Sequence, residues 1–340
     1  MTIDLRSDTV TKPTPSMLNA MMSAKVGDDV FSEDPSINEL ETIAAGMFGK
    51  EAGLFCPTGT MTNQVAIKTH TQPMDEVIVE KSNHVYFYES GGIAYHSLSS
   101  VRLINGDRGR IKPSDIEENI NPNNIHHPHT KLVVIENTSN RGGGSYYQLD
   151  EMKALSEMAH KHNLMIHLDG ARIFNCLVEI NASPNEVGVL FDSVSVCFSK
   201  GLGCPVGSVL LGSKDFIAEA RRNRKAFGGG MRQAGFLAAA AIYALQNHVT
   251  RLKEDHSRAK AIAKTLNETS LLENPVSADT NILIFKLKKE FSAEKMVDKL
   301  KEKNILCFAI GGNAIRMVTH LDFNDEMLNQ VCEVLKNISY

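Results

Sequence analysis

The chain has 340 residues, of which 42% are hydrophobic and 22% charged, and its formal net charge is −4 at pH 7. This length suffices for one large hydrophobic core and a smaller one. The nearly balanced charge argues against a nucleic-acid-binding protein and against a basic membrane-binding surface. One short basic cluster, residues 221–225, is either a solvated helix face or a segment near an anion.

The N-terminus and the cysteines indicate the cellular compartment. The sequence MTIDLRSDTV is charged within its first six residues and lacks the apolar segment of a signal peptide. No stretch approaches the roughly 18 uninterrupted apolar residues of a membrane span. The six cysteines form no C-x-x-C pair, which argues against a disulfide framework or a zinc site. We therefore expect a cytoplasmic protein with reduced cysteines.

Short runs rich in Val, Ile and Leu alternate with helical patterns along the first two thirds of the chain. We predict helices at residues 36–48 and 148–162, and strands at residues 76–80, 101–104, 131–136, 164–169, 192–198 and 207–212. Strands that are apolar on both faces and linked by helices are typical of a mainly parallel sheet covered on each side. The predicted fold class is therefore α/β.

The last third of the sequence has a different pattern. A long helical stretch from about residue 231 to 269, alanine-rich at first, is expected to bridge two domains. A smaller α+β pattern follows, with strands at 281–287, 305–309 and 314–320 and helices at 292–301 and 324–336. We predict a large domain over residues 1–250, with a short N-terminal arm, and a small C-terminal α+β domain over residues 251–340.

Two charged side chains follow buried strands of the predicted sheet. Asp169 ends the strand LMIHLD, and Lys200 follows SVSVCFS and precedes two glycines. Seen alone, Asp169 could cap a helix or pair with Arg172, and Lys200 could cap a strand end. Together they are the pair that pyridoxal phosphate needs: a lysine for the Schiff base and an acid that keeps the pyridine nitrogen protonated.

Two further segments could complete a site for this cofactor. Gly59 and Thr60, in CPTGTMT before a helical pattern, could offer backbone N–H groups to a phosphate at a helix N-terminus, although an ordinary capping turn has the same sequence. His84, just after the strand at 76–80, could lie flat on the cofactor ring, although a lone histidine there is more often structural.

In order along the chain, these motifs resemble those of the threonine aldolases, pyridoxal-phosphate lyases of the aspartate-aminotransferase fold type (fold type I). The resemblance extends from residue 4 to about residue 322. It is carried by DLRSDT (4–9), LFCPTGTMTNQVA (54–66), KLVVIENT (131–138), HLDGARIFN (167–175), SKGLGCPVGS (199–208), GGGMRQAG (228–235) and IRMVTHLD (315–322).

The resemblance implies a role for each matching residue. Lys200 would form the Schiff base, Asp169 would pair with the pyridine nitrogen, His84 would stack on the ring, and Gly59 and Thr60 would bind the phosphate. The substrate carboxylate would be held by Ser7, Arg172 and Arg316, with Arg172 also close to the cofactor. Because a guanidinium matches a carboxylate in a bidentate fork, arginine suits this task.

The family also implies residues shared between subunits. Arg232 and Lys225 would reach the phosphate in a neighbouring subunit's site, so the expected assembly is at least a dimer, with a homotetramer usual in the family. His126 would lie near the substrate hydroxyl; alternatively the segment HHPH (126–129) is a solvated loop or, less in keeping with its proline, a metal site. We expect no metal, nucleic-acid or membrane partner.

The implied reaction is retro-aldol cleavage of L-threonine, L-allo-threonine and related β-hydroxy-α-amino acids to glycine and an aldehyde. His84 and His126 are both candidates for the base, and the sequence does not choose between them. Phe31 and Ser139 stand where relatives often carry Tyr and His, which affects substrate preference. The alternatives are another pyridoxal-phosphate reaction, such as β-elimination or racemisation, and a catalytically silent relative. A dinucleotide-binding dehydrogenase is disfavoured because the glycine runs lack G-x-G-x-x-G.

Overall fold

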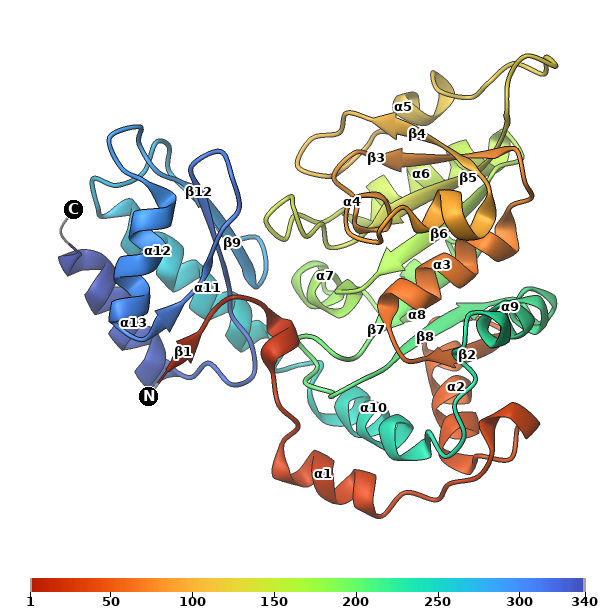
Figure 1. Ribbon diagram of the computed structural model, residues 1–340, viewed down its shortest axis with the longest axis horizontal. Helices are drawn as coiled ribbons and strands as arrows, with labels where there is room; N and C mark the ends of the chain where they lie inside the picture. Colours follow the sequence, from red (N-terminus) through yellow and green to blue (C-terminus); the bar gives the residue numbers. More distant parts are fainter. Residues whose placement is uncertain (1, 339–340) are drawn as a thin grey trace.

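The computed structural model describes residues 2–338 and contains a seven-stranded central sheet and a smaller C-terminal sheet (Figure 1). Five strands of the large sheet, β3 to β7, pair in parallel with one another. The strand β8 runs antiparallel to both of its neighbours, β7 and β2. The strands follow the spatial order β2 (Ala52–Cys56), β8 (Ser208–Gly212), β7 (Ser193–Cys197), β6 (Met165–Gly170), β5 (His129–Glu136), β3 (Asp75–Glu80) and β4 (Ser100–Ile104). The predicted mainly parallel α/β sheet is confirmed, and β2 is a strand that we did not predict.

Helices cover both faces of this sheet, as the two-faced apolar strands require. Along β3, Val77 and Val79 pack towards one layer while Ile78 packs towards the other. The first layer contains α3 (Gly59–His70), α4 (His84–Phe87) and α9 (Lys214–Ala226). The second layer and its edge contain α1 (Pro15–Met22), α2 (Pro35–Met47), α5 (Pro113–Glu117), α6 (Leu149–Lys161), α7 (Ile173–Ile180), α8 (Pro184–Gly188) and α10 (Gly235–Asn247).

A second core lies in the C-terminal part of the chain (Figure 1, blue). Its antiparallel sheet has the order β11 (Phe308–Ala309), β12 (Ala314–Val318), β9 (Ile282–Lys286), and it packs with α11 (Leu252–Asn267), α12 (Ala293–Glu302) and α13 (Asp325–Asn337). The N-terminal strand β1 (Ile3–Asp4) pairs in parallel with β10 (Ile305–Leu306). The first residues of the chain therefore belong to this C-terminal core in space.

Two predicted elements are divided in the structure. The single helix expected over residues 231–269 is two helices, α10 and α11; His248 caps the end of α10, and its Nδ1 donates to Leu202 O at 2.7 Å. The strand expected over residues 305–309 is interrupted at Cys307, which is buried in the C-terminal core, and becomes β10 and β11. No helix within residues 2–338 is long and apolar enough to cross a membrane.

Candidate active site

A cavity of about 640 Å³ opens between the large sheet and the C-terminal part of the chain. Five of the predicted site residues line it: Ser7, His84, Arg172, Lys200 and Arg316. The remaining lining residues are Thr9, Tyr88, Asn140, Arg141, Ile284, Phe308, Ala309 and Ile310. The structure thus brings together side chains from both ends of the chain and from segments that follow four strands of the large sheet, β3, β5, β6 and β7.

Lys200 lies in a tight loop directly after β7. Gly203 N donates to Lys200 O at 2.8 Å, and Thr11 Oγ1 donates to the same carbonyl at 3.1 Å. Gly203 has φ +80°, a left-handed conformation that glycine adopts without strain, and a Cβ there would lie 2.8 Å from Leu321. The loop is fixed, yet Lys200 Nζ has no hydrogen bond or ion pair within residues 2–338. Its amine is therefore available to a group in the cavity.

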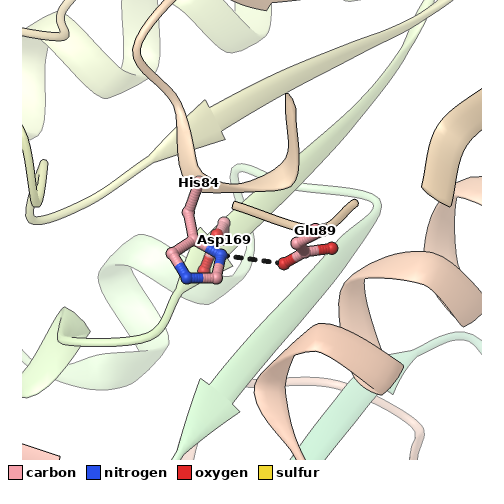
Figure 2. Close-up of side chains that lie close together, drawn as sticks. All are labelled: His84, Glu89 and Asp169. Atoms are coloured by element: carbon pink, nitrogen blue, oxygen red, sulfur yellow. Dashed lines mark hydrogen bonds and ion pairs between the residues drawn. The ribbon is translucent and has the colours of Figure 1, made fainter. Parts of the chain in front are cut away.

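Asp169 and His84 lie next to each other (Figure 2), and His84 lines the same cavity as Lys200. One ring nitrogen of His84 and one carboxylate oxygen each of Asp169 and Glu89 are all within 4.8 Å of one another. Asp169, 1% exposed, accepts hydrogen bonds from Asn63 Nδ2 (3.0 Å) and from Ala171 N (3.1 Å). These donors satisfy a buried carboxylate that would otherwise be costly to bury.

Glu89 orients His84. The Nδ1–H of His84 donates to Glu89 Oε1 at 2.9 Å, which leaves Nε2 on the other side of the ring. Burial alone would lower the pKa of His84, but the hydrogen bond to Glu89 and the charges of Asp169, Glu89 and Glu136 together raise that pKa. The imidazole is thus held in one orientation and made more basic than a free histidine.

Glu136, at the end of β5, is a second buried carboxylate next to Asp169. The two residues are register partners on neighbouring strands. Burial and the charge of Asp169 raise the pKa of Glu136 to about 7, although the backbone N–H groups of Asn140 (2.9 Å) and His84 (3.0 Å) both donate to it. These two bonds hold the ends of two cavity loops in place.

The two arginines of the cavity are held differently. The Arg172 guanidinium forms a two-point ion pair with Asp8 through Nε and Nη2, and Nη1 has no hydrogen-bond partner in the described chain. Arg316 Nη1 donates to Arg6 O and Nη2 to Asn140 Oδ1, each at 2.9 Å. Its Nε is buried without a partner among the described residues. Both arginines retain N–H groups that an anion can occupy.

The N-terminus of α3 provides a site for a phosphate. The Thr58 side chain caps the helix by accepting from Met61 N at 3.1 Å. Within the described residues, the backbone N–H groups of Gly59 and Thr60 have no hydrogen-bond partner. A Cβ added at Gly59 would come no closer than 3.6 Å to any neighbour, so space remains beside the helix end. Free N–H groups and the positive end of the helix dipole suit an anion.

Six predicted site residues do not line this cavity: Gly59, Thr60 and Asp169, described above, and His126, Lys225 and Arg232. His126 is exposed in a turn before β5, at the opposite end of that strand from Glu136, so its place near the substrate stays a prediction. Lys225 is exposed at the end of α9. Arg232 is exposed and donates to Asp28 Oδ2 at 2.7 Å. The last two were expected at a neighbouring subunit's site.

Sequence reasoning missed several residues that the structure places at the site. Asp8 stands in the quoted motif DLRSDT, yet nothing in the local sequence pairs it with Arg172. Asn63, Glu89 and Glu136 are all at most 4% exposed, and a buried polar residue in a predicted helix or strand is the one signal that could have identified them.

The residues present fit the cofactor that the resemblance implies. Among the described residues Lys200 offers an unpartnered amine, and Asp169 offers a buried, hydrogen-bonded carboxylate close to the His84 ring. The start of α3 offers unpaired N–H groups with room beside them. This is the donor set for an aldehyde, a pyridine nitrogen and a phosphate.

Comparisons with known proteins show the family of the chain. The family model described as beta-eliminating lyase matches residues 4–290. The low specificity L-threonine aldolase of Escherichia coli K12 is 43% identical over 330 residues, covering 97% of each chain. Low-specificity L-threonine aldolase 1 of Arabidopsis thaliana is 39% identical over 94% of this chain and 91% of its own.

A solved structure shows the same fold. The threonine aldolase of Leishmania major superposes with a TM-score of 0.84 at 21% identity, covering 98% of both chains. With a match to the family model over most of its length and near-full-length relatives at about 40% identity, the chain belongs to the beta-eliminating lyase family and, within it, to the low-specificity L-threonine aldolases.

Proposed function

We propose that this chain is a pyridoxal-phosphate-dependent carbon–carbon lyase that cleaves L-threonine, L-allo-threonine and related β-hydroxy-α-amino acids to glycine and an aldehyde. The observation that carries the proposal is the unpartnered Lys200 amine, which faces a cavity shared with His84 and two arginines. The named activity of the relatives from Escherichia coli and Arabidopsis thaliana supports it.

The cofactor would be held by Lys200 through its aldehyde, by Asp169 through its ring nitrogen, and by the N-terminus of α3 through its phosphate. When bound, pyridoxal phosphate supplies an electron sink for the bond that breaks at the α-carbon. His84 lies against the site of the ring and is expected to stack on it. Asp169 would pair with the protonated ring nitrogen, and hydrogen bonds from Asn63 Nδ2 and Ala171 N fix its orientation for this.

The arginines and Ser7 bind and orient the substrate. Within the described residues, Arg172 Nη1 and the second hydrogens of Arg316 Nη1 and Nη2 remain for an α-carboxylate, and Ser7 lines the same cavity. Fixing the carboxylate fixes which bond of the α-carbon stands perpendicular to the cofactor ring. His84 Nε2 is the base that takes the β-hydroxyl proton, directly or through one water, because Glu89 holds the opposite nitrogen. A placed base of this kind contributes about 10²–10⁴-fold in rate.

The shared-site arrangement and the domain boundary are part of the same proposal. Lys225 and Arg232 are exposed and lie outside the cavity of their own chain, which suits residues that complete a neighbouring subunit's phosphate site in a homotetramer. The separate core of the C-terminal part supports a boundary near residues 250/251. All six cysteines are free, in keeping with a reducing compartment such as the cytoplasm.

Two measurements test the function. Borohydride should fix the cofactor to the peptide containing Lys200, and Lys200→Ala should lose both the visible absorption and the adduct, while the surface control Lys153→Ala keeps both. Turnover of L-allo-threonine should release acetaldehyde and glycine in equal amounts without any folate. Release of ammonia and a keto acid would instead favour β-elimination, and interconversion of enantiomers would favour a racemase. A protein that binds no pyridoxal phosphate would overturn the proposal.

A further inference from the structure

A chain of buried polar side chains runs from Asp169 into the interface between α3 and the large sheet. On β6, Ile166 and Leu168 pack into the core on one face, so His167 and Asp169 project to the other face, towards α3. Ser193 is the register partner of His167 on β7, so its side chain projects to the same face of the sheet. Asn63 and His70, two turns apart on α3, meet these strands.

The contacts in this interface are continuous. Asn63 Nδ2 lies 3.0 Å from Asp169 Oδ2 and 3.0 Å from Glu89 Oε1. Asn63 Oδ1 lies 3.2 Å from His167 Nε2, and His167 Nδ1 lies 2.8 Å from Ser193 Oγ. Ser193 Oγ lies 2.7 Å from His70 Nε2. Asn63, His167 and Ser193 are at most 2% exposed, so water does not compete for these bonds.

The identities of the partners fix the direction of every bond. Two carboxylates can only accept, so both hydrogens of the Asn63 amide point at Asp169 and Glu89 and its oxygen must accept. His167 therefore carries its proton on Nε2. A neutral imidazole has one N–H, so Nδ1 of His167 accepts the hydroxyl proton of Ser193, and the same hydroxyl oxygen accepts from His70 Nε2.

Burial keeps both histidines neutral, which this directional arrangement requires. Desolvation lowers the pKa of His167 to about 4, against the opposing charge of Asp169. Desolvation, with the charges of His167 and Lys131, lowers the pKa of His70 to about 3. The His70 ring also stacks on Phe216, with centroids 4.4 Å apart. Each ring therefore has one donor and one acceptor at neutral pH.

We propose that His167 is a positioning residue that acts through Asn63: the series His70, Ser193, His167, Asn63 is a one-way row of hydrogen-bond donors that ends on the Asp169 carboxylate and holds it in place. The inference rests on the proposed function for the identity of the group that Asp169 contacts. Hydrogen bonds in series polarise one another, so a neutral histidine remote from the cavity strengthens the donor that reaches Asp169.

The direction of the bonds is open to a direct test. Neutron diffraction from crystals of the cofactor-loaded protein should place deuterium on Nε2 of both His167 and His70, and on Ser193 Oγ towards His167 Nδ1. Deuterium on His167 Nδ1, with Nε2 bare, would overturn the proposal. The deuterium positions do not depend on catalysis. If the protein binds no pyridoxal phosphate, they can still be determined from cofactor-free crystals. Failure of the proposed function and failure of the donor row are therefore distinguishable.

Variants test the effect on the cofactor. In His167→Leu the donor row begins at Asn63, so the hydrogen bond from Asn63 to Asp169 is weaker and the ring nitrogen that Asp169 contacts is less often protonated. The nitrogen that would join Lys200 to the cofactor is conjugated with the ring, so beside a less positive ring it keeps its proton to higher pH. The midpoint of the pH titration of the bound cofactor's visible absorption should therefore rise by about one pH unit, a tenfold change in the equilibrium, and cofactor affinity should fall several-fold.

Rescue and control variants separate positioning from packing. In His167→Gln an amide nitrogen can donate from nearly the same place as Nε2, so the titration midpoint should return to within about 0.3 pH units of the wild-type value. His256→Leu removes another buried histidine bonded to an asparagine oxygen, at 2.9 Å to Asn175, but that histidine pairs with Glu179 and not with Asp169. It should lower stability and leave the titration unchanged. Equal shifts in all three variants, or none in His167→Leu, would overturn the proposal.

Discussion

Arg172 and Asp8, 164 residues apart in the sequence, form a buried two-point ion pair: Nε donates to Oδ2 at 2.7 Å and Nη2 to Oδ1 at 2.6 Å. Asn281 Nδ2 also donates to Asp8, at 3.2 Å, so this carboxylate joins the N-terminal segment, the large sheet and the C-terminal part. The pair leaves a single guanidinium nitrogen for the substrate. Asp8 therefore determines which edge of Arg172 faces the cavity.

Asp8→Asn should impair both stability and substrate binding. Removing one partner of a buried ion pair leaves an uncompensated charge and typically costs about 3–5 kcal/mol. The released guanidinium can also rotate away from the carboxylate site, so KM for L-allo-threonine should rise by at least about tenfold. Urea unfolding and steady-state kinetics measure the two effects. A variant with wild-type stability at pH 7 would show that the ion pair contributes nothing.

The same pair predicts a dependence of stability on pH. Burial alone would raise the pKa of Asp8, but Arg172, with the charges of Lys200 and Arg316, holds that pKa well below its usual range. Because the pKa of Asp8 is lower in the folded than in the unfolded state, its ion pair stabilises the fold fully above the unfolded-state pKa of about 4. This stabilisation is lost as the pH falls from there towards the folded-state pKa. The stability gap between wild type and Asp8→Asn should therefore be constant from pH 6 to 8 and narrow at pH 3.

Glu89→Gln should lower the pKa of His84. The hydrogen bond and charge of Glu89 are among the effects that raise this pKa against burial, and the amide removes the charge. A histidine proton titration by NMR should show the His84 midpoint at lower pH in the variant. Glu117→Gln is the matched control, since Glu117 pairs with the surface His162 at 3.3 Å. An equal change of the His84 midpoint in both variants would contradict the assignment.

Glu136→Gln should stabilise the cofactor-free protein increasingly as pH rises. Burial and the charge of Asp169 raise the pKa of Glu136 to about 7, from an unfolded-state value near 4.3. A raised acid pKa means that the folded state loses stability as pH rises through this interval. The difference in urea midpoint, variant minus wild type, should be larger at pH 8 than at pH 5. A difference that shrinks with pH would show that Glu136 is ionised throughout.

The sequence predicted the sheet and the catalytic pair because both depend on local chemistry. Strands buried on two faces are continuous apolar runs, and a charged residue at the end of such a run followed by glycine is conspicuous, as with Asp169-Gly170 and Lys200-Gly201. The carboxyl ends of parallel strands meet at one edge, so the two residues were expected to lie together. The structure places Lys200 on the cavity wall and Asp169 next to His84, which lines the same cavity.

The parts that sequence reasoning missed depend on contacts between distant segments. Asn63 reaches Asp169 across 106 positions, and the bond of His248 to Leu202 lies at the break between α10 and α11. Neither contact leaves a periodic signal. The sequence predicts only an arm at the N-terminus because two residues, Ile3 and Asp4, are too few to show alternation. Their partner, β10, is equally short.

Arg316→Ala should weaken substrate binding far more than it slows turnover. Burial, with the charge of Arg172, lowers the pKa of Arg316 to about 10, so its guanidinium stays charged at neutral pH. A hydrogen bond to a charged group contributes about 1.5–3 kcal/mol, equivalent to roughly 10–150-fold. KM should rise by this factor with kcat changed less than about fivefold.

The control for this last variant is Arg258→Ala, since Arg258 lies in the same C-terminal part but donates to Asp325 at 2.8 Å and is absent from the cavity wall. Its KM should match that of the wild type. Arg316→Lys should recover only part of the affinity, because an ammonium cannot bond Arg6 O and Asn140 Oδ1 and still present the planar N–H edge that fits a carboxylate. A drop in kcat with unchanged KM would instead assign Arg316 to the transition state alone and leave Arg172 as the carboxylate anchor.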